Sequence, residues 1–149
     1  MAVFRRKTEA PHIKLGRIGE KAAARFLVSE GMEILFRDLK LDAAQIDLIA
    51  RDGETFVFAE VKTRTFRAHI DYSVAKMLSP QQMDRILNAV SEFRKTYHTE
   101  HFPVRCDFIE VQMGRFFPIK IIRHENWFSH KSFRKRNSVP FTLKPESPG

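Results

Sequence analysis

Two short apolar runs on either side of Asp52-Gly53 constrain the fold of this chain more than any other feature. Residues 45–50 and 55–62 are rich in Ile, Leu, Val and Phe. An Asp-Gly pair between two such runs is the strongest short-range signal for a β-hairpin. The sequence therefore predicts two antiparallel strands, and a two-residue turn would pair Arg51 with Glu54.

Four polar side chains are expected on one face of that hairpin: Gln45, Asp47, Glu60 and Lys62. With a two-residue turn, Asp47 lies opposite Phe58 and Gln45 lies opposite Glu60. Because strand side chains alternate with period two, Asp47 and Glu60 become diagonal neighbours roughly 7 Å apart. Two carboxylates at that separation can bind one cation. A four-residue turn would preserve this parity, whereas a three-residue turn would break it.

Apolar neighbours are expected on both faces of the hairpin. They are Ile46, Leu48 and Ala50 on one face, and Ile49, Phe56 and Phe58 on the face of the carboxylates. Charged groups among buried apolar neighbours cost several kcal/mol unless they are paired or bind a metal. A structural ion pair between Glu60 and Lys62 is the simpler interpretation. Asp47 on the same face favours a functional site.

A further carboxylate is expected to reach the core from the segment before the hairpin. Residues 15–30 predict a helix that ends before Gly31, a residue typical of the position after a helix. At about 100° per residue, Glu20 lies within roughly 60° of Ala23 and Leu27 and leans toward the core side. The alternative is that Glu20 only favours the positive end of the helix.

Five motifs occur in an order that resembles a known family: GRIGE, QIDLIA, VFAEVKTR, SPQQ and VRCDFIEV. Over roughly residues 14–112 the chain resembles the bacterial YraN-like family. Those are small proteins of the PD-(D/E)xK restriction-endonuclease-like fold, similar in core to archaeal Holliday-junction resolvases. The resemblance implies an α/β fold with a mixed central sheet of about five strands flanked by helices.

The resemblance also implies roles for particular residues. Glu20 matches the helix glutamate, Asp47 the metal-binding aspartate, and Glu60 and Lys62 the ends of the E-x-K motif. The implied activity is metal-dependent hydrolysis of phosphodiester bonds in DNA, including branched intermediates of repair or recombination. Mg²⁺ or Mn²⁺ would be held by Asp47, Glu60 and a main-chain carbonyl near Val61. Lys62 would orient or help deprotonate the attacking water.

Three positions depart from the pattern of that family. Gln45 stands where the family usually has Glu, Gln82 where it often has Lys, and Leu39 where it has an aromatic residue. Two alternatives to a nuclease therefore stay open. One is a catalytically silent nucleic-acid-binding protein of the same fold, and the other is a basic adaptor that binds an acidic partner protein.

The remaining elements are expected to be scaffold around this site. The sequence predicts strands over residues 32–38, 104–111 and 117–123, and a long loop over 64–78. Ser79, Pro80 and Gln82 form a helix start, and apolar residues at helical spacing continue to about Tyr97. Those apolar positions are core positions.

Positive charge is concentrated at the ends of the chain. Residues 1–14 and 124–149 each carry a net charge of +3, out of +8 for the whole chain. We expect a flexible basic arm over 1–12, an endonuclease-like domain over 13–123, and a basic, Pro-rich tail over 124–149. Basic, aromatic-spaced tails suit phosphate backbones, although merely solvated tails are equally compatible. The predicted nucleic-acid contacts are Arg17, Arg64, Arg67, Lys76, Lys131, Arg134, Lys135 and Arg136.

Composition is typical of a single soluble domain. With 43% hydrophobic residues, 149 residues suffice for one core. No stretch approaches the ~20 apolar residues of a membrane span, so we expect a cytoplasmic location. Cys106 is the single cysteine, which excludes an internal disulfide and a cysteine-based zinc site. Whether the substrate is DNA or RNA, and whether the chain forms a homodimer, is left open.

Overall fold

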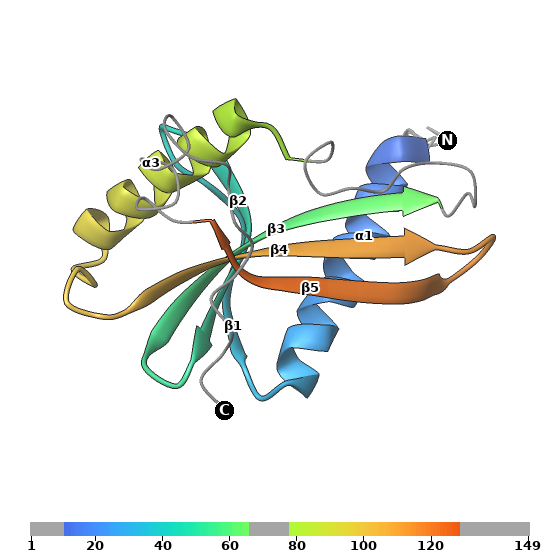
Figure 1. Ribbon diagram of the computed structural model, residues 1–149, viewed down its shortest axis with the longest axis horizontal. Helices are drawn as coiled ribbons and strands as arrows, with labels where there is room; N and C mark the ends of the chain where they lie inside the picture. Colours follow the sequence, from blue (N-terminus) through green and yellow to red (C-terminus); the bar gives the residue numbers. More distant parts are fainter. Residues whose placement is uncertain (1–10, 66–77, 129–149) are drawn as a thin grey trace, which may run out of the picture.

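The structure, a computed structural model, describes residues 11–65 and 78–128 (Figure 1). Within these residues it contains two helices and five strands: α1 (Pro11–Ser29), β1 (Glu33–Lys40), β2 (Gln45–Asp52), β3 (Thr55–Thr65), α3 (Pro80–Thr96), β4 (Val104–Met113) and β5 (Pro118–Phe128). Six of the predicted nucleic-acid contacts lie outside the described residues, as do most of both expected tails: Arg67, Lys76, Lys131, Arg134, Lys135 and Arg136.

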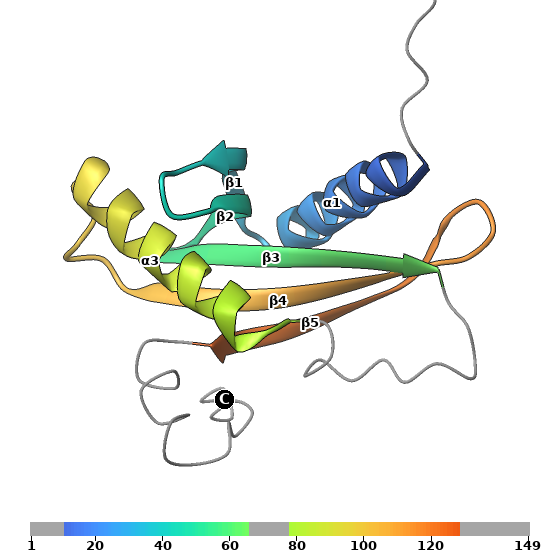
Figure 2. The same cartoon turned by 90° about the horizontal axis from the view of Figure 1, so that it is seen from above.

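The strands form one mixed sheet in the order β1-β2-β3-β4-β5. β3 and β4 are parallel, with α3 in the connection between them, and the other neighbours are antiparallel. Helices α1 and α3 cover opposite faces of the sheet (Figure 2). The predicted α/β fold, with a mixed sheet of about five strands flanked by helices, is confirmed. No helix in the described ranges is long and apolar enough to span a membrane.

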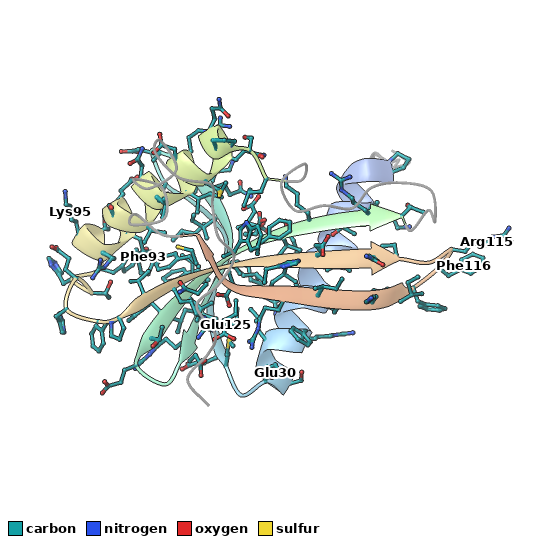
Figure 3. The ribbon with its side chains drawn as sticks, in the orientation of Figure 1. Glu30, Phe93, Lys95, Arg115, Phe116 and Glu125 are labelled. Carbon is teal, nitrogen blue, oxygen red and sulfur yellow. The ribbon has the colours of Figure 1, made fainter. Side chains whose placement is uncertain are left out.

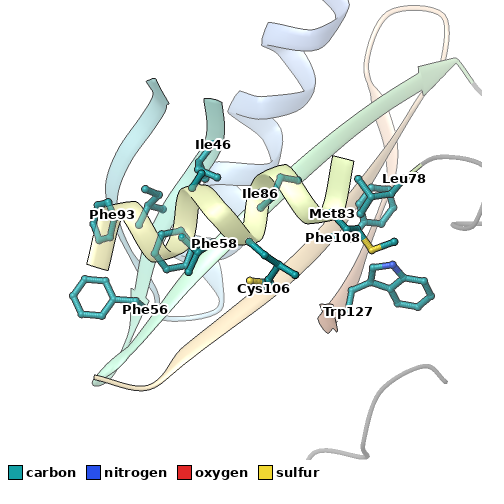
Figure 4. Packing of buried hydrophobic residues seen from close by; sticks show 14 residues of the cluster. Ile46, Phe56, Phe58, Leu78, Met83, Ile86, Phe93, Cys106, Phe108 and Trp127 are labelled. Atoms are coloured by element: carbon teal, nitrogen blue, oxygen red, sulfur yellow. The ribbon is translucent and has the colours of Figure 1, made fainter. Parts of the chain in front are cut away.

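Helix α3 covers the larger of the two cores. Its start has the predicted capping box, in which Ser79 Oγ accepts from the Gln82 N–H at 3.1 Å and Gln82 Oε1 accepts from the Ser79 N–H at 3.0 Å. Its buried side chains pack on Phe58, Cys106 and Phe108 of the sheet (Figure 4). Cys106 is therefore a core residue.

Helix α1 covers the other face, where small side chains let it approach the sheet. Ala23, Ala24 and Leu27 are fully buried against Val57 and Ala59 and their neighbours. The helix ends where the sequence predicted. Gly31 has a φ of +89°, which the helix cannot continue.

The register of the predicted hairpin differs from the expectation. Asp52 pairs with Thr55, so the turn consists of Gly53 and Glu54 rather than Asp52 and Gly53. Gly53 has a φ of +60°, which glycine adopts without strain at the first position of such a turn. The shift is by two residues, so the predicted pairings of Asp47 with Phe58 and of Gln45 with Glu60 are wrong, whereas their parity is retained.

The side chains of strand β2 do not keep a regular alternation between the two faces of the sheet. Ile46 belongs to the core under α3, whereas Leu48 and Ala50 belong to the core under α1. The expectation that these three side chains share one face is therefore wrong. The change takes place around Asp47, just where the pairing of β2 with β3 ends at Leu48. A strand that turns over at this point can direct Asp47 away from a regular sheet face.

The last strand is longer than predicted. The sequence indicates an end at Arg123, but β5 continues to Phe128 through a bulge opposite β4. Asp107, fully buried, accepts from the Asn126 N–H at 2.8 Å and from Arg105 Nε at 3.0 Å. Asn126 has a φ of +51°. A buried carboxylate thus fixes the irregular part of β5, near Glu125 (Figure 3).

Candidate metal centre and nucleic-acid interface

Four carboxylates meet where α1, β1, β2 and β3 come together, and we call them the acidic cluster: Glu20, Asp38, Asp47 and Glu60. Carboxylate oxygens of Glu20, Asp38 and Asp47 lie within 4.8 Å of one another. Glu60 joins them through a hydrogen bond between its carboxyl group and that of Asp47. The structure therefore brings together the three acids predicted from the sequence and adds a fourth.

Asp47 is positioned by the end of the β2–β3 pairing. The ladder stops at Leu48 and Ala59, and Asp47 Oδ2 accepts a hydrogen bond from the Val61 N–H at 2.8 Å. The carboxylate takes the place of a strand carbonyl for that donor. One oxygen of Asp47 is thus held by main chain. Val61 was predicted as a ligand through its carbonyl group, and that role stays a prediction.

Glu20 reaches the cluster because α1 lies close to β3. At Gly19, an added Cβ would fall 2.7 Å from the Thr63 Cβ, so only glycine allows this approach. Glu20 is hydrogen-bonded to Asp38. The approach of the helix therefore carries its carboxyl group to the sheet.

Asp38 was missed as a site residue. It lies at the end of the predicted first strand, and its φ of +49° departs from strand geometry. Gln45 Nε2 donates to Asp38 Oδ1 at 3.3 Å, so Gln45 contacts the cluster through Asp38. An aspartate at a strand end carries no distinctive sequence signal. Only the backbone conformation brings it to the cluster.

The carboxyl groups of Glu20, Asp47 and Glu60 have raised pKa values and hold protons more strongly than usual. Burial raises the pKa of Glu60 to about 9, and the charge of Asp47 adds to this against the opposing effect of Lys62. Burial and the hydrogen bond to Asp38 raise the pKa of Glu20 to about 8. Burial also raises the pKa of Asp47, against the Val61 hydrogen bond. Protons therefore offset part of the mutual repulsion of the acidic cluster.

Lys62 lies next to Glu60 on the same side of β3. Its Nζ is 3.9 Å from Glu60 Oε1, and the two side chains are 32% and 14% exposed. The Glu60–Lys62 contact of the simpler interpretation is therefore present, and it becomes an ion pair when Glu60 loses its proton. Lys62 retains access to solvent beside the acidic cluster, which a purely structural pair does not need.

The acidic cluster suits a hard divalent cation. Its donors are all carboxylate oxygens, which Mg²⁺ and Mn²⁺ prefer. Close carboxylates that hold protons in place of a positive ion are a general property of such donor sets. Glu20, Asp38 and Asp47 could thus hold a metal ion together, with Glu60 adjacent.

A cleft of about 410 Å³ opens directly beside the acidic cluster, and we call it the basic cleft. Glu20 and Asp38 form part of its wall. The other charged residues that line it are all cations: Lys14, Arg17, Lys21 and Arg37. Arg17 was predicted as a nucleic-acid contact, whereas the other three were missed. The i, i+3, i+7 spacing of the three helical cations was the available signal.

A second, smaller cavity of about 130 Å³ lies on the α3 side of Glu60 and is also lined by Gln45, Gln82 and Arg85. Gln82, expected where the family often has lysine, is engaged in the capping box of α3. Arg64, also predicted as a nucleic-acid contact, is half-buried near the end of β3.

Comparison with known proteins identifies the family. A family profile described as "Uncharacterised protein family UPF0102" matches residues 19–111. The chain belongs to UPF0102. The predicted membership of the YraN-like family is thereby confirmed. The matched part contains the whole acidic cluster and Lys62, whereas Lys14, Arg17 and β5 lie outside it.

Two curated UPF0102 proteins match this chain over most of their own length. One from Beutenbergia cavernae is 49% identical over 103 residues, covering 68% of this chain and 84% of that protein. One from Symbiobacterium thermophilum is 37% identical over 101 residues, covering 68% and 84%. A remote likeness is to Pyrococcus furiosus SfsA, solved in complex with Ca²⁺: TM-score 0.32, 14% identity, and 76% of this chain against 61% of that chain.

Proposed function

We propose that this protein is a metal-dependent nuclease that hydrolyses phosphodiester bonds in DNA. The observation that carries the proposal is that the acidic cluster and the basic cleft lie side by side. Glu20 and Asp38 belong both to the acidic cluster and to the wall of the basic cleft. A phosphate drawn into the cleft by its cations would therefore lie against the carboxylates that suit a cation.

Glu20, Asp38 and Asp47 would hold the ion, with Glu60 as an adjacent oxygen donor. When bound, Mg²⁺ or Mn²⁺ would polarise the phosphate and acidify a water molecule. The chain supplies the remaining roles. Lys62, a compact positive charge, would orient the attacking water and offset the negative charge that develops on the phosphate. The cations of the basic cleft would bind neighbouring phosphates of the strand.

A catalytically silent DNA-binding protein is the second candidate. Gln45 stands where the resembling family usually has glutamate, and it is hydrogen-bonded to Asp38. Compared with a glutamate at this position, the neutral amide leaves one negative charge fewer beside the acidic cluster, which weakens the attraction for a divalent ion. The basic cleft would be retained in such a protein.

The deciding experiment is cleavage of linear, flapped and four-way-junction DNA with Mg²⁺ and with Mn²⁺. The wild type should cut at least one substrate, and Asp47→Asn should abolish cutting while DNA binding persists. Glu54→Gln is the matched control, because Glu54 is an exposed carboxylate in the turn of the same hairpin. If the wild type cuts none at high concentration but binds DNA, the silent-binder function replaces the nuclease.

A further inference from the structure

The turn between β4 and β5 carries large apolar side chains into solvent. Phe116 is 72% exposed, Phe117 74% and Ile119 59%, the highest values for large apolar residues in the described ranges. The turn projects past the end of the sheet (Figure 2), and Arg115 and Phe116 lie at its extremity (Figure 3). We call residues 115–119 the hairpin tip. Exposed apolar groups gathered in this way are characteristic of a contact surface.

The conformation of the hairpin tip is defined by internal contacts. The Gly114 N–H donates to the Phe117 carbonyl at 2.8 Å. A Cβ added to Gly114 would approach a methyl group of Ile119 to 2.8 Å, so the turn and the strand behind it are closely packed. The rings are therefore presented on a formed turn, and little conformational entropy is lost when a ligand contacts them.

The chemistry of the hairpin tip fits a nucleobase next to phosphate. The Arg115 guanidinium lies 5.3 Å from the centre of the Phe116 ring, and residues 115–120 contain two cations and no acid. Aromatic rings stack on bases of any sequence, and adjacent cations bind the backbone. The net charge of +8 favours the same polyanionic partner.

A second copy of the chain is a poorer fit for this surface. At roughly 150–250 Å² for each aromatic side chain, the hairpin tip exposes on the order of 400 Å² of apolar area. A stable interface buries about 800 Å² on each partner. The hairpin tip is thus too small to hold two proteins together, whereas it is ample for one or two bases.

The strand pairing gives the distance between the acidic cluster and the hairpin tip. Glu60 is level with Phe108 in the parallel pairing of β3 and β4, and β4 continues to Met113 before the turn. At about 3.3 Å per strand residue, the hairpin tip lies roughly 20 Å beyond Glu60. This corresponds to about six nucleotides at 3.4 Å each. The first turn of α1, which leads into the basic cleft, is at the same end of the molecule (Figures 1 and 2).

We propose that the hairpin tip stacks on an unpaired base at the point where duplex DNA opens into single strands. The substrate class is therefore forked or flapped DNA. The distance to the acidic cluster places the cut about six nucleotides from the fork, and this second statement rests on the proposed nuclease function.

The binding test compares a splayed fork with a fully paired duplex of equal length, without divalent ions. The fork carries 2-aminopurine at its first unpaired position. The wild type should bind the fork at least fivefold more tightly, with reduced 2-aminopurine emission. Phe116→Ala with Phe117→Ala should remove both effects while leaving duplex affinity within twofold. Phe116→Trp with Phe117→Trp should retain them, and Val28→Ser, at an exposed apolar site on α1, should behave as wild type.

Three results would overturn the inference. One is a wild type with no preference for the fork. Another is an alanine double variant that keeps the preference. The third is evidence that the rings mediate dimerisation instead. In that case the wild type would sediment as a dimer and the alanine double variant as a monomer, and both would show the same DNA selectivity.

Mapping of cut positions separates this inference from the nuclease function. If ring-dependent fork binding occurs without cleavage by the wild type, the nuclease function fails and the stacking contact stands. If the wild type cuts forks at positions that the alanine double variant leaves unchanged, the nuclease function stands and the stacking contact fails.

Discussion

Gly19 of α1 lies directly over Thr63 of β3, and a Cβ on the glycine would overlap the threonine hydroxyl group. Glycine inside a helix costs about 1 kcal/mol relative to alanine, so the close approach is retained at the expense of helix stability. Glu20 is the next residue in the chain. The contact therefore fixes how near one member of the acidic cluster can come to the sheet.

Two glycine substitutions in α1 should have opposite effects on stability. Gly16→Ala should raise the free energy of unfolding by about 1 kcal/mol, because nothing lies within 4 Å of the added Cβ. Gly19→Ala should lower it by about 1–3 kcal/mol through overpacking against Thr63. Urea unfolding measures both, and Gly19→Ala with Thr63→Ala should recover part of the loss. Equal stabilisation by the two alanines would contradict the packing.

Metal binding should release protons. Because the pKa of Glu20 is raised to about 8 and that of Glu60 to about 9, both carboxyl groups carry protons at pH 7 that a cation must displace. Affinity for Mn²⁺ should thus rise from pH 6 to pH 9. Calorimetry in two buffers of different ionisation enthalpy counts the protons, and Glu60→Gln should release fewer. Affinity independent of pH would argue against binding at the acidic cluster.

Without divalent ions, stability should fall as pH rises. The raised pKa of Glu60 means that the folded protein binds a proton that the unfolded chain loses near its ordinary pKa of 4.5. This contribution is complete below pH 4.5 and is lost progressively until about pH 9. In Glu60→Gln the melting temperature should decline less between pH 5 and pH 9 than in the wild type. Parallel profiles would show that Glu60 titrates normally.

Lys62→Ala should retain metal and DNA binding but lose cleavage by a factor of about 10² or more, because its contribution is made in the transition state. Lys62→Arg should rescue poorly, since a planar guanidinium keeps its proton and cannot occupy the position of a compact ammonium. Single-turnover cleavage assays measure the effect, with the exposed Lys95 of α3 as the alanine control. Unchanged cleavage by Lys62→Ala would remove Lys62 from the site.

The basic cleft should contribute measurably to the salt dependence of DNA binding. Replacing Lys14, Arg17 and Lys21 by alanine should reduce the slope of log affinity against log salt by about two to three, at roughly 0.9 per duplex phosphate contact. Fluorescence anisotropy between 50 and 200 mM salt, about the range over which such contacts are lost, gives the slope. The contacts would instead lie in the C-terminal tail if the triple alanine variant keeps the wild-type slope and removal of residues 130–149 reduces it.

The sequence predicts the elements of this fold because each has a strong local signal. The Ser79 capping box, Gly31 and the apolar run of β3 all occur where local chemistry indicates. The hairpin register was wrong by two residues because Gly53 can serve either position of a tight turn. The choice is made by long-range packing, which no local pattern contains.

The acidic cluster could be predicted only in part, for a related reason. Glu20, Asp47 and Glu60 stand out because charged residues interrupt apolar segments. Asp38 does not, since its contribution depends on a φ of +49° that the surrounding sequence does not specify. The change of side-chain facing in β2 around Asp47 is likewise a tertiary effect, because Ile46 packs in the core under α3 and Leu48 in the core under α1.

All four members of the acidic cluster precede residue 66, whereas β4, the strand that pairs with β3 beside them, begins at Val104. During synthesis the carboxylates leave the ribosome before the strand that buries their surroundings has been made. Until the rest of the sheet is in place, we expect these carboxylates to be more hydrated than in the complete fold. Arrival of β4 makes their desolvation a late event, so acidic pH or a divalent ion should accelerate the final step of folding.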